Sequence, residues 1–167
     1  MRQRSVFGLM LSLLVFTVHF FTACSREEVD MVKPEIHFDF SGASPIACDT
    51  LFFGEVFHFR MNFSDDVELG AFNLDIHHNF DHHSHTTEGI PCPLDPKKPP
   101  VNPWVFIQDY PIPSGLKFYE ADMEWVLPSG NDAGPYDEGD YHLVVRVTDR
   151  SGWSAYKSFA IKILHAR

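Results

Sequence analysis

Apolar and polar side chains alternate along most of the chain beyond residue 34. In segment 55–63, for example, Phe57, Phe59, Met61 and Phe63 are apolar, and most of the residues between them are polar. This period of two is typical of β-strands that bury one face. No stretch of helical length carries an apolar stripe with a period of 3.6 residues. The pattern predicts seven strands, at residues 35–40, 55–63, 72–76, 104–110, 119–127, 141–149 and 157–164.

Short strands separated by Pro, Gly and Asp are typical of an immunoglobulin-like β-sandwich. The sequence DEGDYHL at 137–143 has the D-x-G-x-Y pattern that leads into the sixth strand of that fold, so we expect Tyr141 to form its tyrosine corner. The predicted fold is therefore all-β, a seven-stranded immunoglobulin-like β-sandwich over residues 34–167. Its longest loop, about residues 78–103, is rich in histidine and contains six prolines. Loops of this length in a compact domain are usually functional or disordered.

Five of the ten histidines lie between residues 77 and 85, in DIHHNFDHHSH. His77 lies at the end of the third predicted strand, directly after residue 76, and His142 lies at the start of the sixth; these two strands are antiparallel neighbours in an immunoglobulin-like sandwich. If Ile76 and Tyr141 point inward, alternation places His77 and His142 on the same outer face. Directly opposed residues have Cβ atoms roughly 5 Å apart, so the two imidazoles can share one ion.

The loop that follows adds further candidate ligands. His83 and His85 are spaced to lie on one side of an extended segment, and Asp81 can add a carboxylate or orient an imidazole. The histidines His77, His83, His85 and His142 predict a site for Zn²⁺ if tetrahedral, or for Cu²⁺ if flatter. His78 and His82 are weaker candidates. The alternative is that His142 is an ordinary residue of the sheet face and that the loop is merely polar.

The N-terminal segment is predicted to be an export signal, because Arg2 and Arg4 precede an apolar run that ends at Ala23. The sequence FTAC resembles the lipobox of bacterial lipoproteins, which predicts acylation of Cys24. We therefore expect a signal peptide over residues 1–23 and an acidic, acylated tether over residues 24–33. The alternative is a membrane-spanning anchor. The acidic SREEVD resembles an export tag, which predicts an outer-membrane lipoprotein on the periplasmic or cell-surface face; an ordinary acidic tether is the alternative.

The net charge limits which binding partners are plausible, and the cysteine content bears on the redox state of the cellular compartment. The whole chain carries a formal charge of −10, and residues 24–167 carry −12, because Arg2 and Arg4 lie in the signal segment. Such a surface repels phosphate backbones, which argues against nucleic acid as a partner, and suits cations. After Cys24, only Cys48 and Cys92 remain, and an oxidising compartment favours a disulfide between them. Their use as soft metal ligands is the competing interpretation.

The segments IHHNFDHHSH and GDYHL, the two spaced cysteines and VTDRSGW together resemble a family of Gram-negative lipoproteins, domain of unknown function 4625. The resemblance covers almost all of the chain after the signal segment. It implies a lipid-anchored immunoglobulin-like domain with a histidine-rich motif, and it implies no established activity.

These features favour a lipid-anchored domain that captures or hands over a transition metal ion, beside an outer-membrane transporter or another envelope protein. No catalytic base or nucleophile is evident in the sequence. One alternative is a small Cu/Zn metalloenzyme of superoxide dismutase type. Another is a structural or adhesive surface module in which a metal only fastens the loop, or in which exposed aromatic residues bind glycan.

Overall fold

Strands account for all the regular structure in the computed structural model, which describes residues 29–84 and 91–166. Residues Met31–Arg167 form one compact unit. Its three-stranded sheet has the order β1 (Glu35–His37), β3 (Val56–Ser64), β6 (Phe118–Val126). The five-stranded sheet has the order β2 (Thr50–Phe53), β10 (Ser154–His165), β9 (Gly139–Asp149), β4 (Leu69–His78), β5 (Phe106–Pro111). A small hairpin joins β7 (Gly130–Asn131) to β8 (Gly134–Pro135).

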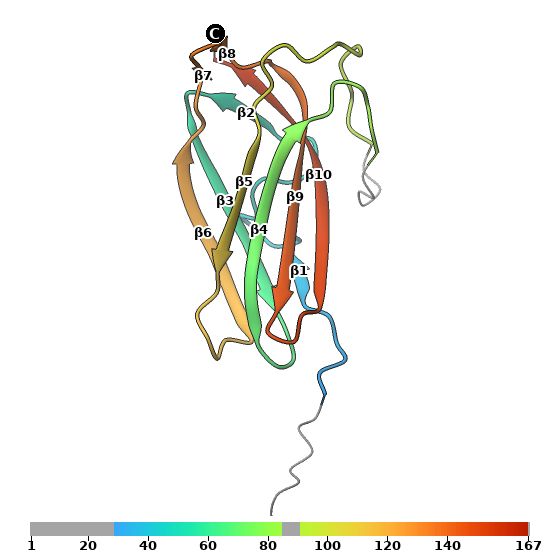
Figure 1. Cartoon of the computed structure of the whole chain (residues 1–167), viewed down its shortest axis with the longest axis vertical. Helices are drawn as coiled ribbons and strands as arrows, with labels where there is room; N and C mark the ends of the chain where they lie inside the picture. Colours follow the sequence, from blue (N-terminus) through green and yellow to red (C-terminus); the bar gives the residue numbers. More distant parts are fainter. Residues whose placement is uncertain (1–28, 85–90, 167) are drawn as a thin grey trace, which may run out of the picture. The chain divides into compact units, whose positions relative to one another are not determined.

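The two sheets pack face to face as a sandwich, as Figure 1 shows. The alternation seen in the sequence decides which residues lie between them. On β3 the side chains of Phe57, Phe59, Met61 and Phe63 are at most 1% exposed, and the residues between them are not buried. The rings of Phe63 and Phe72 meet across the core with their centroids 5.0 Å apart. The predicted all-β class is therefore confirmed.

Three strands escaped prediction: β2 and the two short strands of the β7–β8 hairpin. Segment Thr50–Phe53 forms β2 and pairs in parallel with the end of β10, with Thr50 opposite Lys162 and Phe53 opposite His165. Its four residues bury only Phe53 fully, so no apolar alternation marks it in the sequence. Each of the seven predicted runs contains a strand, although the first shortens to three residues and the third grows to ten.

Tyr141 makes the upstream hydrogen bond that was predicted for it. Its hydroxyl donates to the carbonyl oxygen of Asp137 at 2.7 Å and accepts the backbone N–H of Trp104 at 3.2 Å. Burial raises the pKa of Tyr141 to about 12. The buried ring and its two bonds fix the entry to β9, where the candidate site residue His142 follows directly.

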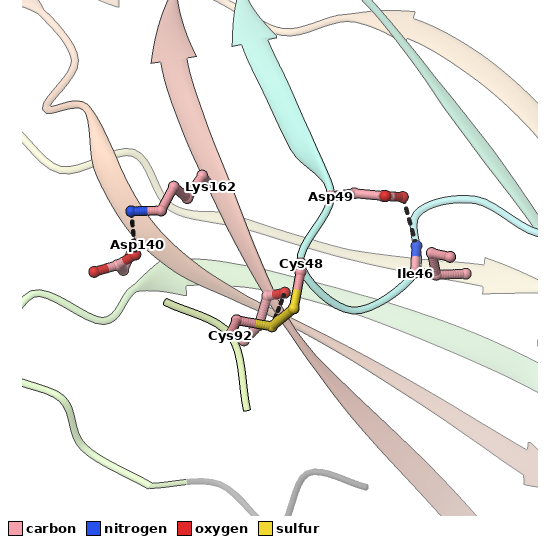
Figure 2. The surroundings of a disulfide bond; sticks show 7 residues. Ile46, Cys48, Asp49, Cys92, Asp140 and Lys162 are labelled. Carbon is pink, nitrogen blue, oxygen red and sulfur yellow. Dashed lines mark hydrogen bonds and ion pairs between the residues drawn. A yellow bond between two sulfur atoms is a disulfide. The ribbon is translucent and has the colours of Figure 1, made fainter. Parts of the chain in front are cut away.

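The predicted disulfide between Cys48 and Cys92 is present, with a Cα–Cα distance of 5.3 Å (Figure 2). It attaches the proline-rich segment to Cys48, two residues before β2, and the sulfurs are therefore not thiolate ligands. The same segment has polar anchors. Asp95 accepts a hydrogen bond from Lys162 at 2.5 Å, and its backbone N–H donates to Asp140 at 2.8 Å. Although burial lowers the pKa of Lys162, its bonds to Asp95 and Asp140 raise it overall.

Candidate metal centre

The first part of the candidate site lies where β4 ends beside the start of β9. His77 stands directly opposite His142 in the antiparallel register, and the core residues Ile76 and Leu143 form the next pair. The predicted neighbourhood of His77 and His142 is therefore correct. His142 is more enclosed than a residue of an open sheet face, because only 3% of it is exposed. One residue of the following loop, His83, packs against it, with ring centroids 5.2 Å apart.

A tight turn after β4 brings the chain back over these two histidines. The backbone N–H of His82 donates to the carbonyl of Asn79 at 3.1 Å, and His82 adopts a positive φ of 58°. Phe80 fastens the turn to the core, because it is 2% exposed and its ring meets the ring of Tyr141 edge-on at 5.5 Å. The chain reverses at this turn, so the next residue, His83, lies against His77 and His142.

The three imidazoles converge closely enough to hold one ion. One ring nitrogen from each of His77, His83 and His142 lies within 4.8 Å of the other two. The ring centroids are 5.5 Å apart for His77 and His83, 5.8 Å for His77 and His142, and 5.2 Å for His83 and His142. The side chains of His77 and His83 are 21% and 35% exposed. The cluster therefore has a buried floor, His142, and a rim that solvent reaches.

Two carboxylates orient two of these rings. Asp75 Oδ1 lies 2.8 Å from His77 Nδ1, and Asp81 Oδ1 lies 2.6 Å from His83 Nδ1. The bond to His83 lowers the pKa of Asp81 to about 2, so this carboxylate is charged at neutral pH. Metal-binding histidines commonly donate their second N–H to a carboxylate in this way, which leaves Nε2 as the ligand atom.

Of the two carboxylates, only Asp81 was predicted. It lies against His83 and outside the group of three convergent nitrogens, which favours the orienting role over that of a direct ligand. Asp75 was missed. The signal that identifies both is a repeated D-x-H pattern, DIH at 75–77 and DHH at 81–83. On β4 this spacing puts Asp75 and His77 on one face of the strand.

Among the described residues, no other histidine joins the group of three, although the ring of His78 lies 6.5 Å from that of His83. His85 falls outside the described residues, so its place in the predicted ligand set is untested. His78 packs its ring on Phe80 at 4.9 Å, and burial lowers its pKa. His82 turns away to contact the carbonyl oxygen of Asp95 at 2.9 Å. Each of the remaining described histidines has a separate hydrogen-bond or ion-pair partner: His37 with Ser64, His58 with Glu124 and His165 with Tyr136.

The ligand atoms of the three histidines favour some metal ions over others. Three imidazole nitrogens suit Zn²⁺ or Cu²⁺ and suit Ca²⁺ or Mg²⁺ poorly, because those harder ions require oxygen ligands. Three protein ligands also leave a coordination position for water or an exchangeable ligand. The site can therefore hold a borderline transition metal without enclosing it.

Comparison with known proteins identifies the family. Residues 22–164 match the model of the family described as Domain of unknown function (DUF4625). The chain therefore belongs to the DUF4625 family, as its histidine motif, cysteine pair and GDYHL segment indicated. No curated protein matches the chain. Within the described residues there is no helix long and apolar enough to cross a membrane.

Proposed function

We propose that this protein is a lipid-anchored, extracytoplasmic immunoglobulin-like domain that binds Zn²⁺ or Cu²⁺ through His77, His83 and His142, for capture or handover of the ion. The observation that carries the proposal is the convergence of three imidazoles from two segments that are 59 residues apart at their nearest, between His83 and His142. A loop that was only polar gives no reason for a buried histidine on a distant strand to join it.

The strand order supports the immunoglobulin-like part of the proposal. The first, second and fifth predicted strands are β1, β3 and β6 of one sheet, and the third, sixth and seventh are β4, β9 and β10 of the other. This division corresponds to strands A, B and E against C, F and G of that fold. The hydrogen bond from Tyr141 to Asp137 supplies the tyrosine corner.

Metal titration is the direct test. We expect the full-chain protein, purified without an affinity tag and stripped of metal, to bind one equivalent of Zn²⁺ or Cu²⁺. Affinity should fall as the pH drops below the ~6.5 reference pKa of histidine, because protons compete for the ligand nitrogens. The far-UV spectrum should not change on stripping, because β4 and β9 are held by the sandwich core. Loss of the fold instead would favour a metal that only fastens the loop, and no stoichiometric binding would reject the proposal.

The orienting carboxylates give a finer test. Asp75→Asn and Asp81→Asn keep the size of each side chain but remove the charge, and each should lower metal affinity by about 10- to 100-fold. Glu124→Gln is the matched control, because Glu124 lies 3.0 Å from His58, a histidine outside the cluster. Isothermal titration of the four proteins measures the difference. Equal affinities in all four would show that the carboxylates do not tune the ligands.

Anchoring rests on Cys24, which lies outside the described residues. In cells of a Gram-negative host fed labelled fatty acid, the wild-type chain should incorporate the label and the Cys24→Ala variant should not, because the acyl chains attach at that thiol. Fractionation should then find the variant released from the membrane. Label retained by the variant would overturn the lipoprotein assignment and leave the metal site unaffected.

A further inference from the structure

A pair of buried carboxylates lies at the other end of the strands that carry the histidine cluster. Asp65 is the first residue after β3, and Asp149 is the last residue of β9, whereas His142 lies near the start of β9. Figure 1 shows the β3–β4 and β9–β10 connections together at the lower end of the sandwich. Gly70 permits the close approach of β4 there, because a Cβ atom would lie 2.9 Å from the carbonyl oxygen of Asp149.

The two carboxylates face each other. A carboxylate oxygen of Asp65 lies within 4.8 Å of one from Asp149. Each residue uses its Oδ1 atom locally: Asp149 accepts the backbone N–H of Trp153 at 2.9 Å, and Asp65 accepts those of Val67 and Glu68 at 2.9 and 2.7 Å. Each Oδ2 atom is buried and, among the described residues, has no hydrogen-bond partner. Asp149 as a whole is only 4% exposed.

Two cationic residues adjoin the pair, Arg150 after Asp149 and Lys117, whose carbonyl accepts the backbone N–H of Asp65, and both side chains have other partners. Arg150 lies 3.4 Å from Glu68 and donates to Ser114 at 2.9 Å. Lys117 donates to the carbonyl oxygen of Asp66 at 2.6 Å. Although each Oδ1 atom has backbone donors, burying the two charged groups with their Oδ2 atoms unpaired within the described part of the chain is costly. A cation bound between the two carboxylates offsets this cost.

We propose that Asp65 and Asp149 bind a Ca²⁺ ion, at a second site that is chemically distinct from the histidine cluster. Ca²⁺ takes oxygen ligands at roughly 2.3–2.6 Å, so two oxygens that share one ion lie no more than about 5 Å apart. The separation of the carboxylates meets this limit. Mg²⁺, with ligands at about 2.0–2.1 Å, requires them closer together. The remaining ligands of the ion would come from water, and the formal charge of −10 favours a cation.

The test uses the full-chain protein treated with chelator, to which CaCl₂ or MgCl₂ is then added. At a Ca²⁺ concentration about 100-fold above Kd, the melting temperature should rise by roughly 5–10 °C, and Mg²⁺ should give a smaller rise. Tb³⁺, a luminescent substitute for Ca²⁺, reports the location. Trp153, whose backbone bonds Asp149, should sensitise Tb³⁺ emission, and Ca²⁺ should quench this emission by competition.

Relative to the wild type, Asp149→Asn should raise the melting temperature in chelator and lower it in Ca²⁺. Its amide can donate to the carboxylate of Asp65, so the variant should melt above the wild type in chelator, yet gain nothing from Ca²⁺. Asp65→Asn should also lose the Ca²⁺ response. Asp66→Asn, in the same turn but exposed, should keep it, and His142→Gln should keep it because imidazole does not bind Ca²⁺. No rise in melting temperature with Ca²⁺ in the wild type would refute the site.

Discussion

Replacing His142 should abolish tight metal binding, although this residue lies 57 positions beyond the histidine-rich segment. His142 is the buried floor of the three-imidazole group, with its ring 5.8 Å from that of His77 and 5.2 Å from that of His83. Loss of an orienting residue alone costs about 10- to 100-fold in affinity, so we expect loss of a ligand to cost more than roughly 100-fold. His77→Ala and His83→Ala should have effects of similar size.

The measurement is competitive titration with Zn²⁺ and Cu²⁺. His142→Gln accompanies His142→Ala, because glutamine fills more of the buried space and separates ligand loss from a packing defect. His58→Ala and His165→Ala are the controls and should leave affinity unchanged, since both side chains bond elsewhere. Wild-type affinity in a folded His142 variant would contradict the shared site and reduce the cluster to a polar loop.

The half of the site that lies on strands was predictable from the sequence. Strand alternation fixes the face on which a residue lies, and the strand order of the fold fixes its neighbours. Together these placed His77 opposite His142, and the observed register agrees. The same reasoning identified the core residues of β3. It succeeds because a strand has a single period, and a shift by one residue would expose its whole apolar face.

The half that lies in the loop was less predictable. The return of His83 depends on the turn at Asn79–His82, on the positive φ of His82 and on the burial of Phe80. None of these follows from a periodic pattern, because a turn is decided by a few local bonds and one side chain. The orienting role of Asp75 was missed for a different reason: a carboxylate on the outer face of a strand is ordinary until its partner is known.

Contacts between distant segments are the hardest to predict from a sequence when neither segment shows a periodic apolar pattern. Thr50–Phe53 is too short to show alternation, and its parallel pairing with β10 joins segments more than 100 residues apart. Asp65 and Asp149 are 84 residues apart and occur in ordinary turn sequences. Their burial and their mutual approach come from the packing of whole strands, which a local pattern does not encode.

Breaking the disulfide should destabilise the domain and also weaken metal binding. The bond closes a loop of 44 residues, for which the chain-entropy model gives about 4 kcal/mol. Reducing it, or replacing both Cys48 and Cys92 by serine, should therefore lower the melting temperature by roughly 10 °C or more. Mass spectrometry of non-reduced digests checks the pairing first, and free thiols at both positions would refute it.

The effect on metal binding follows from what the tethered segment holds in place. The backbone N–H of Lys98 donates to the carbonyl of Phe80 at 3.1 Å, and His82 contacts Asp95 at 2.9 Å, so residues 92–98 support the turn that presents His83. Without the bond we expect Zn²⁺ affinity to fall several-fold, less than for loss of a ligand. Met61→Ala, buried on the other sheet, is the control: it should cost about 2–5 kcal/mol of stability and leave affinity unchanged. Equal affinity in the reduced and oxidised proteins would show that the turn positions His83 without the tethered segment.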